Sequence, residues 1–137
     1  MSQEDFGELI DKARTIRRHI IEMTTSAASG HPSSSLSSVE IMVALYFRVL
    51  HYKPCDPNWE DRDRFILSKG HAAPVLYAVL AEAGCIPIHE LKALRKIDSR
   101  LQGHPAVECP GTEIATGSLG QGLSVANGMA LAAKLDR

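Results

Sequence analysis

The sequence predicts a helix-rich α/β fold in a single, incomplete domain. Between Phe6 and Met23, apolar residues recur at steps of three and four, the period of one buried helix face. Residues 64–68, "RFILS", have the short apolar character of a buried strand, and this is the one clear strand that the sequence predicts. One strand cannot form a sheet, and the sequence stops at "KLDR" after a predicted helix. We therefore expect residues 1–137 to be a piece of a longer domain.

Proline, glycine and serine mark the ends of the predicted helices. The first helix is expected to fade over residues 26–30, and Pro32 biases His31 toward a loop conformation. Ser37 or Ser38 can cap a second helix through residues 39–50. The remaining helices are predicted at 73–83, at 89–97 and from about residue 120 to the end, with irregular chain over 99–117.

Composition and charge exclude several classes of function. Fifteen Lys and Arg against sixteen Asp and Glu leave a formal charge of −1, so no general attraction to nucleic acid or an anionic membrane is expected. The sequence has no apolar run near the roughly 18–20 residues of a membrane span, and its acidic, amphipathic first residues are not expected to be a secretory signal. Cys55, Cys85 and Cys109 lack C-x-x-C spacing and basic neighbours, which favours a reduced, cytoplasmic protein without a disulfide framework or a cysteine nucleophile.

Three histidines, His31, His71 and His104, each follow a glycine on a separate predicted loop. Glycine allows the backbone to approach a ligand closely, and histidine gains and loses protons near neutral pH, so the pattern indicates a ligand-lined cleft. Incidental loop histidines are the alternative. A zinc site is less favoured, because the three are forty and thirty-three residues apart without a companion at i+3 or i+4. The other three histidines, His19, His51 and His89, are expected at the surface.

Residues 116–122, "TGSLGQG", place three glycines directly before a predicted helix. Such a turn exposes peptide groups to a ligand, although a flexible turn that packs closely is the alternative. The order G-x-x-G-x-G matches neither the dinucleotide-binding fingerprint nor the P-loop, and Ser118 lacks the frame of a hydrolase nucleophile.

Four motifs in this order, "SGHPSSSLSSVEIM", "DRFILSKGHAAPVLYAVLAEAG", "SRLQGHP" and "PGTEIATGSLGQGLSVANGMALAAKLD", resemble the amino-terminal part of transketolases. The resemblance begins near Ala13 and is strongest to the separately encoded amino-terminal subunits of split transketolases. It implies a thiamine diphosphate-binding fold, a parallel sheet flanked by helices. It also implies transfer of a two-carbon ketol unit from a ketose phosphate to an aldose phosphate, a reaction of the pentose phosphate pathway.

The resemblance also implies roles for single residues. His31 and His104 match catalytic histidines that bind sugar hydroxyls and assist proton transfer. His71 matches a contact to the diphosphate side of the cofactor, and Ser34 matches a position near the cofactor.

The glycine-rich turn matches the family's contacts to the two rings of the cofactor, which involve Gly117, Ser118 and Leu119. Lys69 adjoins this site, and the resemblance suggests that it adds positive charge near a phosphate.

The family's metal-binding motif is not in this sequence. In relatives a Gly-Asp-Gly motif follows the region that matches residues 134–137, and with a later Asn it binds the Mg²⁺ or Ca²⁺ that anchors the diphosphate. A glutamate from another domain is also needed. We therefore expect no metal ligand here and no activity from this chain alone. Its expected partners are sugar phosphates and a carboxy-terminal transketolase region or subunit, in a homodimer or heterotetramer.

Two other functions stay open at this point. One is a thiamine-dependent synthase of the deoxyxylulose-phosphate type, which shares the first Gly-His loop but is disfavoured by "LQGHP" and "TGSLGQG". The other is an inactive fragment or regulatory paralogue that keeps the loops.

Overall fold

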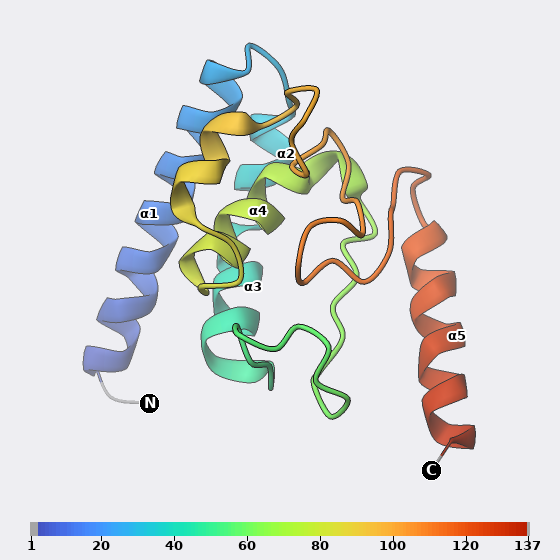
Figure 1. Cartoon of the computed structure of the whole chain (residues 1–137). Coiled ribbons are helices and arrows are strands. Elements are labelled where there is room, and N and C mark those ends of the chain that lie inside the picture. The colour runs from blue at the N-terminus through green and yellow to red at the C-terminus, as the bar shows by residue number, and fades with distance from the viewer. Residues whose placement is uncertain (1–2, 137) are drawn as a thin grey trace.

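The computed structural model describes residues 3–136 as an assembly of helices joined by long irregular segments (Figure 1). The elements in chain order are α1 (Gln3–Ser26), α2 (Pro32–Leu36), α3 (Val39–Ala44), the π-helix η1 (Leu45–Val49), the 3₁₀-helix η2 (Gly70–Ala72), α4 (Ala73–Glu82), the 3₁₀-helix η3 (Ile88–Ala93) and α5 (Gln121–Leu135).

Helix α4 lies at the centre of the helical assembly, where α1, α2, α3 and both 3₁₀-helices contact it. Nine consecutive residues of α4, from Ala73 to Ala81, are buried. A helix that is apolar on all sides is stable only when neighbours cover it on all sides. Helix α1 supplies part of that cover through Ile16, Ile20 and Met23, as the apolar period of its sequence predicts.

The predicted strand at 64–68 is wrong, because the residues described here contain no strand. The segment still enters the core, since Leu67 is 7% exposed and Phe65 packs against the buried cluster. A strand requires a hydrogen-bonded partner, and no segment within 3–136 pairs with this one. The helix-rich part of the predicted fold class is thus confirmed, whereas its parallel sheet is not seen among residues 3–136.

Most predicted helices are confirmed, with two corrections. Helices α1, α4 and α5 lie where they are predicted, and the segment between η3 and α5 is irregular. The helix predicted at 89–97 is instead the 3₁₀-helix η3, which ends before Leu94; Arg95 then takes a left-handed conformation with φ of 61°. Ser38 precedes α3, but its side chain makes no cap hydrogen bond to it. The sequence analysis also missed the short helix α2.

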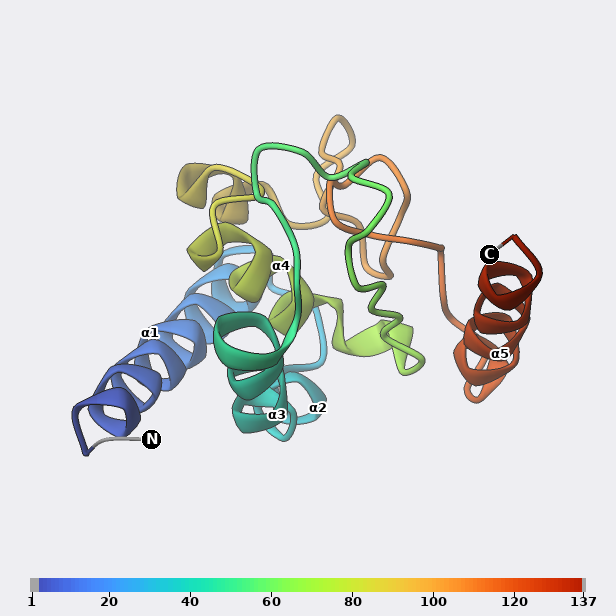
Figure 2. The ribbon, with the colours of Figure 1, turned by 90° about the horizontal axis from the view of Figure 1, so that it is seen from below.

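Helix α5 stands apart from the rest of the described chain in two perpendicular views (Figures 1 and 2). Gly122 is its one buried residue, and Leu123, Leu131 and Leu135 are exposed. Among residues 3–136, no helix combines the length and apolar character needed to cross a membrane.

His19 is not the surface residue that its polar neighbours predict. Its side chain is 15% exposed, and its Nε2 lies 2.9 Å from Glu82 Oε1. Lys12 Nζ donates to the other Glu82 oxygen at 2.7 Å, so one carboxylate joins α1 to the end of α4. Burial alone would raise the pKa of Glu82, but these two hydrogen bonds outweigh it and hold the pKa below its ordinary value. His51 and His89 are exposed, as predicted.

Candidate functional site

The structure brings His31, Ser34 and His71 together at one end of the helical assembly. His31 precedes α2, Ser34 lies within it, and His71 lies in η2 just before α4. Ser34 Oγ lies 2.7 Å from His71 Nε2. The rings of His31 and His71 meet edge to face, with centroids 5.3 Å apart. His31 is exposed and His71 is half-buried, so both remain near solvent while their orientations are restrained.

The serine-rich sequence of α2 has a local physical reason. Ser35 is fully buried, and both its backbone N–H and its hydroxyl donate to the carbonyl oxygen of His31, at 3.1 and 3.0 Å. Ser37 Oγ donates to the carbonyl of Ser34 at 2.9 Å. Serine hydroxyls that bond back to the preceding turn compete with regular helix, which fits a helix of five residues. Short side chains on α2 therefore hold the backbone beside His31.

A close backbone contact joins the His71 segment to the glycine-rich turn. A Cβ atom on Gly70 would lie 2.1 Å from the carbonyl oxygen of Thr116, so only glycine fits there. Thr116 is 5% exposed, and its hydroxyl donates to the carbonyl of Leu67 at 2.7 Å. Gly122 makes a similar contact, because its Cβ would lie 2.7 Å from Cα of Ser68. The two motifs, forty-odd residues apart in sequence, are therefore fixed side by side.

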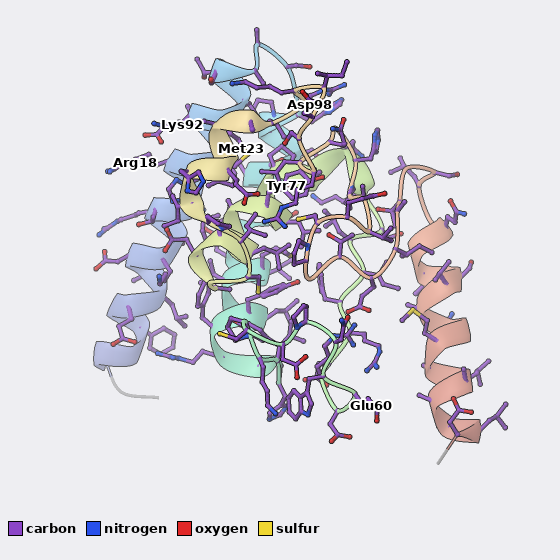
Figure 3. The ribbon with its side chains drawn as sticks, viewed as in Figure 1. Arg18, Met23, Glu60, Tyr77, Lys92 and Asp98 are labelled. Carbon is purple, nitrogen blue, oxygen red and sulfur yellow. The ribbon has the colours of Figure 1, made fainter. Side chains whose placement is uncertain are left out.

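His104 lies next to Gly117 of the glycine-rich turn. A Cβ on Gly117 would lie 3.6 Å from His104 Cδ2, an ordinary van der Waals distance. The hydroxyl of Tyr77, which is 0% exposed, lies 3.0 Å from the carbonyl oxygens of both Gln102 and His104. Figure 3 shows Tyr77 in the interior of the molecule. A buried tyrosine of α4 thus holds the backbone of the loop that carries His104.

Gly117, Ser118 and Leu119 form an exposed surface before α5. Leu119 is 70% exposed. Gly120, at the N-cap of α5, has a φ of 90°, a left-handed conformation that favours glycine. The turn therefore presents peptide groups and one apolar side chain outward.

The seven residues that the sequence analysis assigned to catalysis or to cofactor binding thus lie in two neighbouring clusters. The first consists of His31, Ser34 and His71, and the second of His104 and residues 117–119. The contact between Gly70 and Thr116 joins them. The sequence analysis missed Tyr77, although one tyrosine in the otherwise apolar run "APVLYAVLA" is a signal, because a buried hydroxyl needs a hydrogen-bond partner.

The largest cavity among those identified lies elsewhere and contains none of these residues. Its volume is about 1010 Å³, and its lining includes Met23 of α1 and Lys92 of η3, both labelled in Figure 3. Among the side chains that the structure describes, residues 6–136, no three from His, Cys, Asp or Glu are placed to hold a metal ion together. Burial raises the pKa of Cys109 to about 11 and also raises that of Cys85, so neither thiol is activated.

The two clusters offer two kinds of contact to a ligand. Exposed peptide groups at 117–118 beside the Leu119 side chain can contact a flat ring through hydrogen bonds and apolar surface. The hydroxyl of Ser34 and the ring nitrogens of His71 are groups that can donate hydrogen bonds to the oxygens of a phosphate.

Comparison with known proteins shows that the sequence is similar to transketolases. The family model described as "Transketolase, thiamine diphosphate binding domain" matches residues 10–136. The transketolase of Pongo abelii is 54% identical over 132 residues, which are 96% of this chain and 21% of that protein. One of the subunits of the apulose-4-phosphate transketolase of Actinobacillus succinogenes is 49% identical over 131 residues, 94% of this chain and 48% of that protein.

Solved structures agree with the sequence comparison. The transketolase of Leishmania mexicana superimposes with a TM-score of 0.87 and 37% identity, over 90% of this chain and 19% of that one. The transketolase of Campylobacter jejuni gives 0.86 and 40%, over 92% of this chain and 20% of that one. The chain therefore spans about a fifth of the length of these transketolases.

Proposed function

Because the chain belongs to the transketolase family, we propose that it carries the amino-terminal part of the thiamine diphosphate-binding domain of an enzyme that transfers a two-carbon ketol unit from a ketose phosphate to an aldose phosphate. Residues 1–137 supply contacts to substrate and cofactor in this proposal. The observation that carries it is the junction of the two clusters, where a close contact at Gly70 places the His71 segment beside the turn at 116–119.

Each residue then has a task that its geometry allows. The cofactor supplies the electron sink for cleavage of a carbon–carbon bond. The exposed imidazoles of His31 and His104 bind sugar hydroxyls and move protons at their ring nitrogens, since imidazole serves as acid and base near neutral pH. His71 and Ser34 bind the diphosphate side of the cofactor.

The glycine-rich turn completes the proposed cofactor contacts. Gly117 and Ser118 offer peptide groups to the cofactor rings, and Leu119 supports the rings with apolar surface. Loops held by buried contacts can position reactants without large motion, which is the main contribution required of a protein that uses a reactive cofactor.

The rest of the enzyme supplies what this chain does not. The Mg²⁺ or Ca²⁺ ligands and the catalytic glutamate come from a carboxy-terminal region or a separate polypeptide. The complete enzyme is a cytoplasmic homodimer or heterotetramer. The similar protein of Actinobacillus succinogenes is named as one of several subunits, which supports a separate partner polypeptide for this chain.

Substitutions in the complete enzyme test whether His31 and His104 act on the substrate and His71 on the cofactor. We expect His31→Ala and His104→Ala each to lower kcat/KM for sugar phosphates by about 10²-fold, the range for a lost acid–base group, with little change in cofactor affinity. His71→Ala is expected instead to raise the thiamine diphosphate concentration needed for half-maximal activity. His51→Ala, at an exposed site beside Asp63, is the matched control. Near-normal turnover of both His31→Ala and His104→Ala would refute the assignment.

The alternatives predicted from sequence are not favoured by the relatives. The similar proteins described above are named transketolases rather than synthases of the deoxyxylulose-phosphate type. Two assay mixtures distinguish the two reactions: a ketose phosphate donor with an aldose phosphate acceptor, and pyruvate with glyceraldehyde 3-phosphate. Absence of both activities in the complete protein would support the inactive or regulatory alternative.

A further inference from the structure

Lys69 links η2 to α2. It occupies the N-cap position of η2, two residues before His71, and its side chain reaches the C-terminal end of α2. Its Nζ donates to the carbonyl oxygen of Ser34 at 2.8 Å and to Ser37 Oγ at 3.0 Å. A positive charge next to the last carbonyl groups of a helix is favourable, because these groups lack partners within the helix.

The same contacts restrain Ser34 from two directions. Its carbonyl accepts from Lys69, and its hydroxyl lies 2.7 Å from His71 Nε2. Ser37 Oγ closes a ring of hydrogen bonds, since it accepts from Lys69 and donates to the Ser34 carbonyl at 2.9 Å. A five-residue helix has little stability of its own, so its position depends on such contacts.

We propose that Lys69 is a positioning residue, which fixes Ser34 and through it the rings of His71 and His31 in the arrangement that cofactor binding requires. This inference rests on the proposed function. It differs from the phosphate contact suggested by the family resemblance, because two of the three N–H donors of the ammonium group are directed at α2. Lys69 thus acts on the site through its hydrogen bonds to α2 and not through contact with the ligand.

Three variants of the complete transketolase, assembled with its carboxy-terminal region, test this role. Lys69→Met keeps most of the aliphatic stem and removes the donors; we expect the half-saturating concentration of thiamine diphosphate to rise about tenfold, with a smaller loss of kcat at saturation. Lys69→Arg keeps the charge and several donors, and should restore most of the affinity. Ser37→Ala keeps the ammonium charge but removes one acceptor of Lys69 together with the Ser37 donor to the Ser34 carbonyl, and should weaken cofactor binding in the same direction by a smaller factor.

The result for Ser37→Ala separates positioning from direct phosphate binding. A lysine that served only as a phosphate ligand would be unaffected by Ser37→Ala, so unchanged cofactor affinity in that variant would overturn the proposal. Ser37→Ala also carries the test if Lys69→Met fails to fold. A loss of kcat alone in Lys69→Met, with cofactor affinity unchanged, would overturn it as well.

A structural measurement distinguishes failure of this inference from failure of the proposed function. In a crystal structure of Lys69→Met without ligands, we expect Ser34 Oγ and His71 Nε2 to separate beyond hydrogen-bond distance. An unchanged separation would overturn the role of Lys69 whether or not the enzyme transfers ketol units. Absence of ketol transfer in the unsubstituted enzyme, together with an increased separation in the variant, would overturn the proposed function and leave the positioning contact supported.

Discussion

Tyr77→Phe removes a single oxygen from the interior and should displace the loop that carries His104. The Tyr77 hydroxyl is buried and lies 3.0 Å from the carbonyl oxygens of Gln102 and His104, so the variant leaves two carbonyls without this donor. Burial also raises the pKa of Tyr77, so the hydroxyl remains a hydrogen-bond donor near neutral pH. A lost hydrogen bond that leaves a partly buried acceptor unsatisfied costs about 2 kcal/mol.

The assay is steady-state kinetics of the complete enzyme. An energy of about 2 kcal/mol corresponds to roughly a 30-fold change, and we expect a fall in kcat/KM for sugar phosphates up to that factor with little change in cofactor affinity. Tyr46→Phe is the matched control, because it removes the same atom from another buried tyrosine, whose ring packs against Tyr52 and Phe65. If Tyr77→Phe loses no more activity than Tyr46→Phe, the hydroxyl does not position His104 and the reasoning fails.

Three further outcomes can be checked. The pKa of Glu82 is lowered in the folded protein despite its burial, so its charge stabilises the fold above pH 4.5, and this stabilisation is lost as the pH falls through the folded-state pKa. Urea unfolding should show that Glu82→Gln is less stable than the unsubstituted protein near pH 7. The difference in unfolding free energy between the two proteins should narrow below pH 4.5. Gly70→Ala places a Cβ 2.1 Å from a backbone oxygen and should lower the free energy of unfolding by about 1–3 kcal/mol in the same measurement. Gly128→Ala is the control, because a Cβ there meets nothing within 4 Å and should not destabilise the protein. Equal stabilities of the two variants would contradict the close contact at Gly70. A thiol reagent near neutral pH should modify exposed Cys55 before buried Cys109, whose pKa is raised to about 11, and the reverse order, followed by mass spectrometry, would contradict this assignment.

The helix pattern and the choice of site residues were accessible from the sequence by itself. The apolar period of α1 identifies its buried residues from Ala13 to Met23, although Phe6 and Ile10, which share that period, are exposed. Pro74 marks the first turn of α4, and the glycines before α5 mark its start. Such signals are local, because a helix closes its hydrogen bonds within a few residues. The three Gly-His pairs and "TGSLGQG" likewise indicate a ligand site through the chemistry of glycine and histidine, and their order indicates the family.

Only the tertiary structure decided the features that need a partner distant in sequence. Residues 64–68 form no strand among the described residues because none of these pairs with them, and His19 is partly buried because Glu82 of another helix binds it. The site depends on the same kind of information. Its two clusters meet because Gly70 lacks a Cβ where the Thr116 backbone passes. No periodicity or spacing in the sequence predicts where the Thr116 carbonyl lies relative to Gly70.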